Sequence, residues 1–178
     1  MRLTDDAWLA HGLLALADAG PEALTIEALC LRADRSKGSF YHHFESIAAY
    51  RERLVAHWRE RDTEEIIRLS LAHREATGQL DALNRLTSHL DMRLEQAMRK
   101  LGAQDPTVAH VVREVDRRRT GFLVQLHLAT GDFAPEDAEL VAQVSYAAFV
   151  GFQVIAPEMQ AEVSQDAYLR FMRLLKRG

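Results

Sequence analysis

The sequence predicts an all-α protein, and three observations support that prediction. Apolar residues recur at helical spacing along nearly the whole chain, and no convincing strand alternation is present. Glycine and proline are sparse, at 9 and 4 of 178 residues. Aromatic residues are also few, at 7% of the chain. The length suits one domain, or a small domain fused to a larger one.

Three short helices are predicted in the first part of the chain. A hydroxyl residue stands where each helix would begin, and its side chain can accept the hydrogen bond of a free backbone N–H group. A glycine followed by a proline ends the first helix. A three-residue turn joins the other two, which is typical of a helix-turn-helix motif. In chain order these positions are Thr4, Gly20-Pro21, Thr25, the turn Ala33-Asp34-Arg35, and Ser36.

Longer helices are predicted after Ser46, which caps the fourth. We expect that helix to continue to Leu69, and Gly78 to break the chain. The stretch from Leu140 to Ala156 is the most apolar of the sequence, so we expect it to be covered on more than one side. The remaining segments are predicted from Leu80 to about Gly102, from Pro106 to the stop at Gly131 in two helices, from Pro135 to Pro157, and around Tyr168 to Leu175.

Charge and cysteine content narrow the class of protein. The formal net charge of -4 argues against indiscriminate binding to nucleic acid, although a local cationic site remains compatible with it. Cys30 is the only cysteine, so no intrachain disulfide can form and we expect a buried thiol in a reducing cytoplasm. No apolar run reaches the roughly 20 residues that span a bilayer. The N-terminus has no apolar signal region, and we expect no membrane partner.

The segment Ser36–Phe44, which reads SKGSFYHHF, carries the strongest functional signal. It places small donors, a cation and aromatic side chains on one short helix that can enter a DNA groove. Phe40 and Phe44 lie four residues apart and share a buried face, while Lys37 points outward. The candidate DNA-contacting residues are Thr25, Arg35, Ser36, Lys37, Gly38, Ser39, Tyr41 and His42.

From about Trp8 to Trp58 the sequence resembles the TetR family of transcriptional regulators. The resemblance is carried by the segments Leu24–Leu29, reading LTIEAL, and Ser36–Phe44. It implies a homodimer with a DNA-binding domain at residues 1–45. It also implies a helical domain at residues 46–178 that binds a small-molecule effector and forms the dimer. Effector binding would change the spacing of the two DNA-reading heads.

The resemblance also implies individual roles. Thr25, Tyr41 and His42 match the family's phosphate contacts, and Phe40 and Phe44 match the residues that pack the recognition helix. Three positions depart from the family pattern. The turn usually reads Ala-Gly-Val and here ends in Asp34-Arg35, although Asp tolerates the left-handed conformation. Ile47 replaces a frequent basic residue, so one phosphate contact is absent and DNA affinity should be lower.

The candidate residues for effector binding and for dimerisation lie on the later helices, and most have amphipathic, soft or aromatic side chains. The triplet Arg117-Arg118-Arg119 lies beside acidic residues, so we interpret it as a solvated or salt-bridged face and not as a nucleic-acid site. The candidate effector-binding residues are His89, Met92, Arg93, Met98, Phe122, Gln125 and Tyr146. The candidate dimer-interface residues are Phe149, Phe152, Phe171 and Leu175.

The sequence therefore predicts a ligand-responsive, dimeric DNA-binding regulator, in the simplest reading a repressor released from double-stranded operator DNA. The alternative is a helical ligand-binding or protein-interaction module whose helix-turn-helix no longer reads DNA. An enzyme is disfavoured because the sequence has no P-loop, dinucleotide fingerprint or nucleophile elbow. The eight histidines include no pair with convincing metal-ligand spacing, so neither a metal nor a cofactor is expected.

Overall fold

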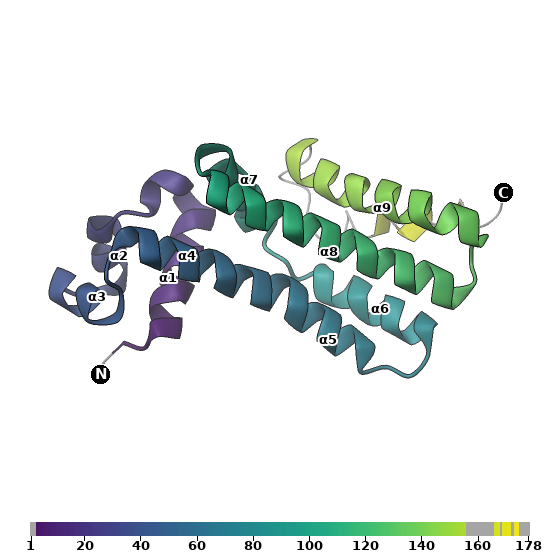
Figure 1. Cartoon of the computed structure of the whole chain (residues 1–178), viewed down its shortest axis with the longest axis horizontal. Helices are drawn as coiled ribbons and strands as arrows, with labels where there is room; N and C mark the ends of the chain where they lie inside the picture. The colour runs from purple at the N-terminus through teal and green to yellow at the C-terminus, as the bar shows by residue number, and fades with distance from the viewer. Residues whose placement is uncertain (1–2, 156–165, 168, 172, 175–178) are drawn as a thin grey trace. The chain divides into compact units, whose positions relative to one another are not determined.

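The computed structural model describes residues 3–155, 166–167, 169–171 and 173–174. Within these residues every regular element is a helix, as the sequence predicted. Figure 1 labels the α-helices in chain order. They are α1 (Asp5–Ala19), α2 (Ile26–Ala33), α3 (Lys37–His43), α4 (Ile47–Arg59), α5 (Glu65–Leu71), α6 (Ala76–Thr87), α7 (Met92–Gln104), α8 (Pro106–Thr130) and α9 (Pro135–Ile155), with a 3-10 turn at Pro21–Ala23 and a π-helical turn at Glu60–Glu64.

The described chain divides into two compact units. The first unit comprises Met1–Glu60 and Arg93–Arg113, and the second comprises Arg61–Met92 and Glu114–Gly178. This division by packing differs from the domains expected at residues 1–45 and 46–178. All of α4 and most of α7 pack with the first three helices instead of with the later ones.

Four predicted helix starts are confirmed by their hydrogen bonds. The Thr4 and Thr25 hydroxyls each accept a backbone N–H at 3.2 Å, from Ala7 and Ala28. The Ser36 and Ser46 hydroxyls accept in the same way at 3.2 and 3.1 Å. Each cap satisfies one of the N–H groups that the first turn of a helix leaves without an intrahelical partner. The predicted stops at Gly20 and Gly131 are also confirmed, because both residues adopt a positive φ.

An aromatic cluster forms the centre of the first unit. Phe40 of α3 is fully buried and lies edge-on to Trp8 of α1, with ring centroids 5.5 Å apart. Tyr50 of α4 contacts Phe44 edge-on at 4.9 Å and donates a hydrogen bond of 2.9 Å to the Trp8 carbonyl. Edge-to-face pairs of this kind add to the burial of apolar area. The cluster therefore fixes α3 against α1 and α4. Cys30 is buried in the same unit, as predicted.

Helix α7 joins the first unit through a buried polar contact. The Trp58 indole N–H of α4 donates to the Glu95 carboxylate at 3.0 Å, and both side chains are almost fully buried. Glu95 and the apolar Met98 share the inward face of α7.

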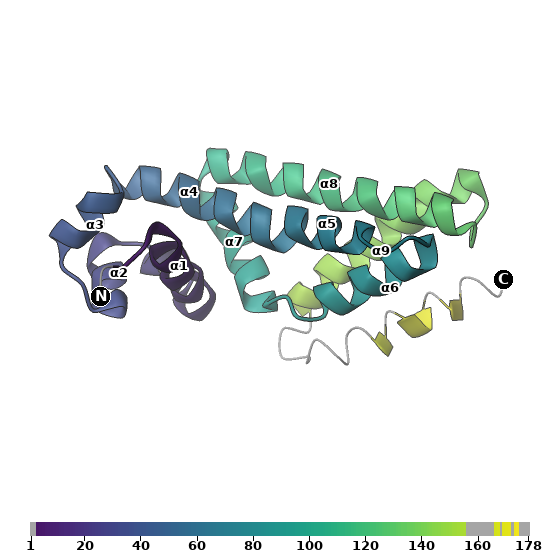
Figure 2. The same cartoon turned by 90° about the horizontal axis from the view of Figure 1, so that it is seen from below.

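The second unit packs α5, α6, α8 and α9 around its own core. Helices α5 and α6 are joined by a short turn and lie side by side in Figures 1 and 2. Ile67, Phe122 and Leu126 are buried together, and Leu80 and Leu83 of α6 pack against them.

Several predicted boundaries in the middle of the chain were wrong. Gly78 does not break the chain but lies in the first turn of α6, since a glycine there costs about 1 kcal/mol without ending the helix. The single helix expected from Leu80 to Gly102 is two helices, α6 and α7. Just where α6 ends, the Thr87 and Ser88 hydroxyls donate to backbone carbonyls at 2.9 and 2.7 Å, which competes with helix continuation.

Two other long helices differ in detail. The expected helix from Ser46 to Leu69 winds continuously but contains the wide π turn at Glu60–Glu64. The segment from Pro106 to Gly131 is one helix, α8, instead of two.

Helix α9 is the most apolar element and keeps much of its surface exposed. Its side chains at Leu140 and Val144 are 59% and 41% exposed. By length and composition alone α9 is apolar enough to cross a membrane, which the sequence analysis did not anticipate. Three acidic residues occur in its first five, and its buried positions are Ala138, Ala142, Ser145 and Gln153. Much of the cover expected for this helix is therefore absent from the single described chain.

Candidate nucleic-acid interface and effector cavity

The turn between α2 and α3 orients the recognition helix. Asp34 adopts the left-handed conformation, with φ 52° and ψ 54°, as the sequence predicted. The Asp34 N–H donates to the Leu31 carbonyl at 3.3 Å and the Arg35 N–H to the Cys30 carbonyl at 2.9 Å. These two bonds satisfy carbonyls at the end of α2 in the arrangement of a Schellman motif. The turn is therefore regular despite lacking the family's glycine.

Helix α3 places polar residues on one exposed face. Lys37 is exposed, Tyr41 is 54% exposed, and His42 is exposed beside them. Gly38 is exposed, and the nearest heavy atom to a Cβ built there would be the Ser36 hydroxyl at 3.7 Å. A flat surface without a side chain at this position lets another backbone approach closely.

The remaining candidate DNA contacts lie next to this face. Thr25 and Ser36 are exposed, and their hydroxyl oxygens accept the cap bonds, so each O–H group is still able to donate to a phosphate. Arg35 is half-buried and donates a 2.6 Å hydrogen bond to the Asp34 carbonyl. Ser39 is half-buried. The structure thus brings all eight residues onto α3, its turn and the start of α2.

Lys37 has a partner that sequence reasoning missed. Its ammonium forms an ion pair with the carboxylate of Glu27 on α2, and both side chains are more than half exposed. This hydrogen bond lowers the pKa of Glu27 and raises the pKa of Lys37. The two residues are ten apart in sequence, and only the angle between α2 and α3 brings them together. No local sequence signal would have found the pair.

A second polar cluster holds the end of α3 against α1. The Asp5 carboxylate lies 2.6 Å from His43 Nδ1 and 2.7 Å from an Arg53 guanidinium nitrogen. Hydrogen bonds from Arg53, and next from His43, lower the pKa of Asp5. The Arg53 guanidinium also lies over the Phe44 ring, 5.0 Å from its centroid. His43, for which the sequence left surface and packing roles open, is therefore a half-buried packing residue.

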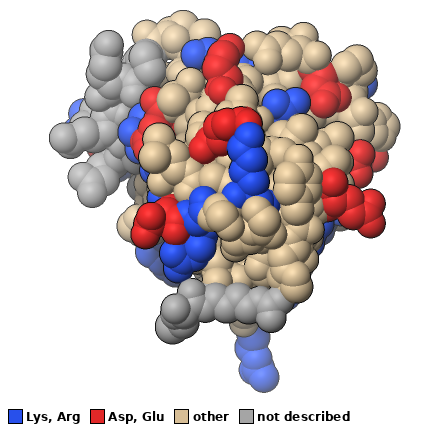
Figure 3. Space-filling view, turned by 90° about the vertical axis from the view of Figure 1, so that its left-hand side faces the viewer, with Lys and Arg blue, Asp and Glu red and all other residues tan. Residues whose placement is uncertain are grey.

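Charges of both signs surround the reading face. Figure 3 shows the side of the molecule on which α2 and α3 lie in Figure 1, and there Lys and Arg side chains are interspersed with Asp and Glu. Binding of a polyanion to such a surface depends on a few positioned contacts instead of on a broad basic field.

The second unit contains a cavity of about 110 Å³ that is partly open at its mouth. Three of the seven candidate effector-binding residues line it: Met92, Phe122 and Tyr146. Two candidate interface residues, Phe149 and Phe152, line it as well. The other lining residues are Asp62, Thr63, Ile66, Ile67, Leu83, Asn84, Thr87, Ser88, Leu90, Arg119, Leu123 and Ser145.

The other four candidate effector residues lie elsewhere. His89 and Gln125 are exposed and do not line the cavity. Met98 is fully buried in the first unit. Arg93, also in the first unit, lies 3.4 Å from the Asp18 carboxylate. Of the candidate interface residues, Phe171 is 38% exposed and Leu175 lies outside the described residues.

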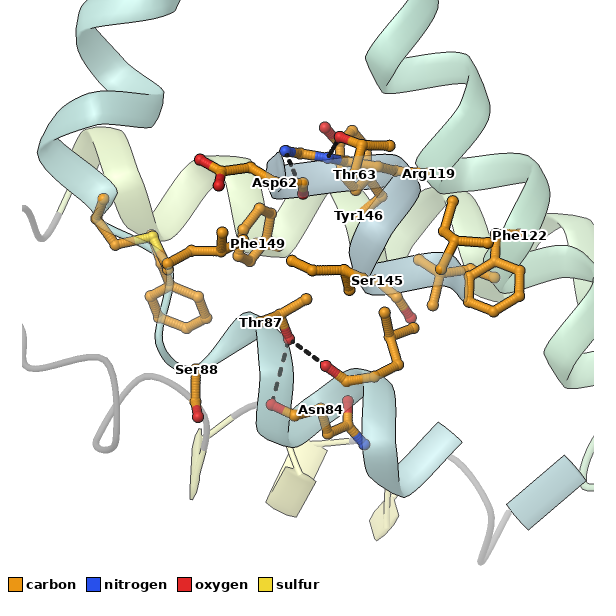
Figure 4. Close-up of a pocket in the computed structure, with 17 residues that line it drawn as sticks. Asp62, Thr63, Asn84, Thr87, Ser88, Arg119, Phe122, Ser145, Tyr146 and Phe149 are labelled. Carbon is orange, nitrogen blue, oxygen red and sulfur yellow. Dashed lines mark hydrogen bonds between the residues drawn. The ribbon is translucent and has the colours of Figure 1, made fainter. Parts of the chain in front are cut away.

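Hydrogen bonds organise one end of the cavity, which Figure 4 shows. Arg119 donates to the Thr63 hydroxyl at 2.9 Å and to the Asp62 carbonyl at 3.1 Å. Arg61 binds the Asp62 carboxylate through two hydrogen bonds of 2.5 and 2.7 Å. Thr87 and Asn84 lie on the opposite side of the space in the same view. Of the arginine triplet, Arg118 forms an ion pair with Glu64 at 3.2 Å, whereas Arg119 lines the cavity.

A regular three-residue turn, a capped helix with a polar outward face, and an aromatic anchor beneath it define a helix-turn-helix DNA-binding protein. Residues 10–52 match the family of bacterial regulatory proteins described as the tetR family. This match assigns the helix-turn-helix segment of the first unit to that family. No curated protein gives a significant sequence match.

Solved structures share the fold over nearly the whole chain. A predicted TetR-family regulator from Rhodococcus sp. superposes with a TM-score of 0.72 at 17% identity, covering 96% of each chain. A predicted transcriptional regulator from Pseudomonas aeruginosa PAO1 gives 0.70 at 18% identity, covering 99% of this chain and 94% of that one. The predicted regulator SCO7518 from Streptomyces coelicolor A3(2) gives 0.59 at 18% identity, covering 92% and 94%. At these identities the likeness concerns the fold.

Proposed function

We propose that the protein is a homodimeric cytoplasmic repressor, without enzymatic activity, that a small-molecule effector releases from double-stranded operator DNA. One observation carries the proposal most directly. Helix α3 exposes Lys37, Tyr41 and His42 while Phe40, on its opposite face, is fully buried in the aromatic cluster. Such a helix has an anchored side and a side left open to a groove.

The exposed residues divide into two roles in this proposal. Thr25, Tyr41 and His42 would contact phosphates and fix the position of the head, without reading sequence. Lys37 would reach base edges, with Ser39 or Arg35 beside it, and Gly38 and Ser36 would allow close approach of the DNA backbone. The two heads of a dimer would occupy half-sites about one helical turn apart or slightly more.

Dimerisation through α9 and the segment after it would explain the exposed apolar face. Leu140 and Val144 are exposed in the single chain, although α9 is the most apolar helix. Phe171 would extend this interface, whereas Phe149 and Phe152 line the cavity. The dimer would have one conformer whose two heads match the spacing of the operator half-sites and another whose heads do not. An effector that binds the second conformer more tightly would lower DNA affinity, at most by the ratio of its affinities for the two conformers.

The first experiment compares wild type and two variants in anisotropy titrations against a duplex selected from a random pool. Lys37→Ala should weaken binding about tenfold or more and relax the preference for the base pair that Lys37 contacts. Lys100→Ala is the matched control, because this lysine is also exposed and belongs to the first unit but lies on α7. Its binding should stay close to wild type. Equal binding by all three proteins would remove Lys37 from the interface.

Glu27→Gln tests the ion pair of the reading head. DNA must displace the Glu27 carboxylate from Lys37, so this variant should bind about two- to fivefold more tightly, as expected for an exposed pair. The gain should disappear when Glu27→Gln is combined with Lys37→Ala. A gain that persists in the double variant would mean that Glu27 acts by general repulsion of phosphate and not through Lys37. If the wild-type protein shows no salt-dependent binding to any duplex, the alternative of a module that has lost DNA recognition is favoured.

A further inference from the structure

The inference concerns the chemistry of the effector and rests on the proposed ligand response. We propose that the cavity of the second unit takes a small, uncharged, mostly apolar molecule about the size of a single six-membered ring, with one hydroxyl or amide donor. The volume of the cavity, the nature of its wall and the pairing of its charges each support one part of this statement.

The volume limits the size of the ligand. The cavity measures about 110 Å³. An apolar cavity of roughly 150 Å³ in another protein takes up benzene, so a space of this order encloses one ring and not two. A fused two-ring compound would have to displace packed side chains such as Phe122 and Ile67, or leave its second ring outside the cavity.

The wall of the cavity is mainly aromatic and aliphatic. Phe122, Tyr146, Phe149 and Phe152 contribute rings, and these come from two different helices, α8 and α9. In Figure 4 the labelled Phe149 and Phe122 lie on opposite sides of the space. The aliphatic side chains that complete the wall are Ile66, Ile67, Leu83, Leu90 and Leu123. An apolar ring buried among such groups gains free energy through removal of its surface from water.

The charged groups at the cavity already have hydrogen-bond partners. Asp62 and Arg119 are the charged side chains among the lining residues. Arg61 binds the Asp62 carboxylate through two hydrogen bonds, and Arg119 donates to the Thr63 hydroxyl. Tyr146 donates its hydroxyl hydrogen to Asp116 at 2.7 Å. A ligand charge would have to displace one of these hydrogen bonds or remain without a partner among the apolar side chains, and both are costly.

One polar atom is suited to accept a hydrogen bond from the ligand. The Thr87 hydroxyl donates its hydrogen to the Leu83 carbonyl at 2.9 Å and lies 3.2 Å from the Asn84 carbonyl. Its donor capacity is therefore occupied, whereas its oxygen retains lone pairs. A ligand O–H or N–H group directed to Thr87 would orient the ring between the aromatic side chains.

Matched pairs of neutral and charged probes test whether the cavity prefers an uncharged ligand. Cyclohexanol and cyclohexylammonium differ in a hydroxyl against an ammonium group, and benzamide and benzoate differ in a neutral amide against a carboxylate. By calorimetry at pH 7, each neutral member should bind at least about tenfold more tightly than its charged counterpart. 2-Naphthamide, with two rings, should bind more weakly than benzamide. Tighter binding of either ion, or of the two-ring compound, would overturn the inference.

Two variants assign the binding to this cavity. Thr87→Val keeps the size of the side chain and removes the acceptor, so cyclohexanol should bind about fivefold more weakly. Leu90→Phe, in the segment between α6 and α7, adds volume to the wall and should reduce binding of both neutral probes. Both variants should keep the wild-type melting temperature and DNA affinity. Unchanged probe binding in both would place the probes elsewhere and overturn the inference.

The readouts separate the inference from the function on which it rests. Neutral probes that bind as expected without releasing the DNA duplex would support the ligand class and contradict the effector response. Release of DNA by a charged compound acting at this cavity would support the effector response and overturn the ligand class.

Discussion

At Gly12, an added methyl group should have two opposite effects on stability: a gain from helix propensity and a cost from overpacking. It lies in α1, is buried, and faces Tyr50 of α4. A Cβ atom at Gly12 would lie 1.8 Å from the Tyr50 hydroxyl oxygen, 2.9 Å from Tyr50 Cζ and 3.1 Å from Leu54 Cδ1. The Gly12→Ala variant therefore requires the Tyr50 side chain to move, which removes its hydrogen bond to the Trp8 carbonyl.

The expected change in unfolding free energy follows from three contributions. Alanine in a helix interior stabilises by about 1 kcal/mol relative to glycine. Overpacking of a filled core costs about 1–3 kcal/mol, and a buried hydroxyl without its acceptor costs about 1–3 kcal/mol. The balance is a destabilisation of about 1–5 kcal/mol, because the two costs together exceed the gain in propensity.

Urea unfolding at a fixed protein concentration measures this change. Gly121→Ala is the matched control: Gly121 lies inside α8, and no atom among the described residues would lie within 4 Å of its Cβ. That variant should gain about 0.5–1 kcal/mol from propensity alone. Tyr50→Phe should recover part of the loss in Gly12→Ala, since it removes the closest atom. A Gly12→Ala protein as stable as wild type would refute the packing argument.

Three further variants have defined outcomes. Phe44→Ala should lower the stability of the first unit by about 3–5 kcal/mol through a cavity, because Phe44 is 2% exposed; an unaltered melting curve would show that the site closes without cost. Gly151→Leu should leave the monomer folded, since none of the described atoms would lie within 4 Å of its Cβ, but should dissociate a dimer formed through α9; light scattering that still reports the wild-type mass would remove α9 from the interface. Burial raises the pKa of Tyr50 well above its ordinary value near 10. The neutral Tyr50 hydroxyl therefore contributes fully to the free energy of unfolding below pH 10, and this contribution is lost as the pH rises beyond that value. Wild type should consequently lose more stability between pH 9.5 and 11 than Tyr50→Phe, and equal losses would contradict this.

Helix starts were predictable because an N-cap is a local interaction. The caps at Thr4, Thr25, Ser36 and Ser46 depend on residues within three positions of each other, and all four bonds are present. The left-handed Asp34 was predictable for the same reason. Most residues of the reading face followed from one short motif that forms α3 and its turn, and Thr25 was recognised as the cap of α2.

Features that depend on packing between helices were not predictable in this way. The Lys37–Glu27 pair requires the angle between two helices, and the sequence contains no sign of it. The cavity required knowledge of which helix face turns inward within which unit. Met98 and Phe122 look alike in the sequence as soft core residues, yet one fills the first unit and the other lines the cavity of the second.

The π turn at Glu60–Glu64 sets the orientation of two residues that line the cavity, Asp62 and Thr63. An α-helix rotates by about 100° per residue, so expelling one residue from such a turn would rotate Asp62 and Thr63 by that angle. Arg119 would then lose two of its hydrogen-bond acceptors. Amide hydrogen exchange within Glu60–Glu64 should consequently respond to cavity occupancy before any other part of α4 or α5.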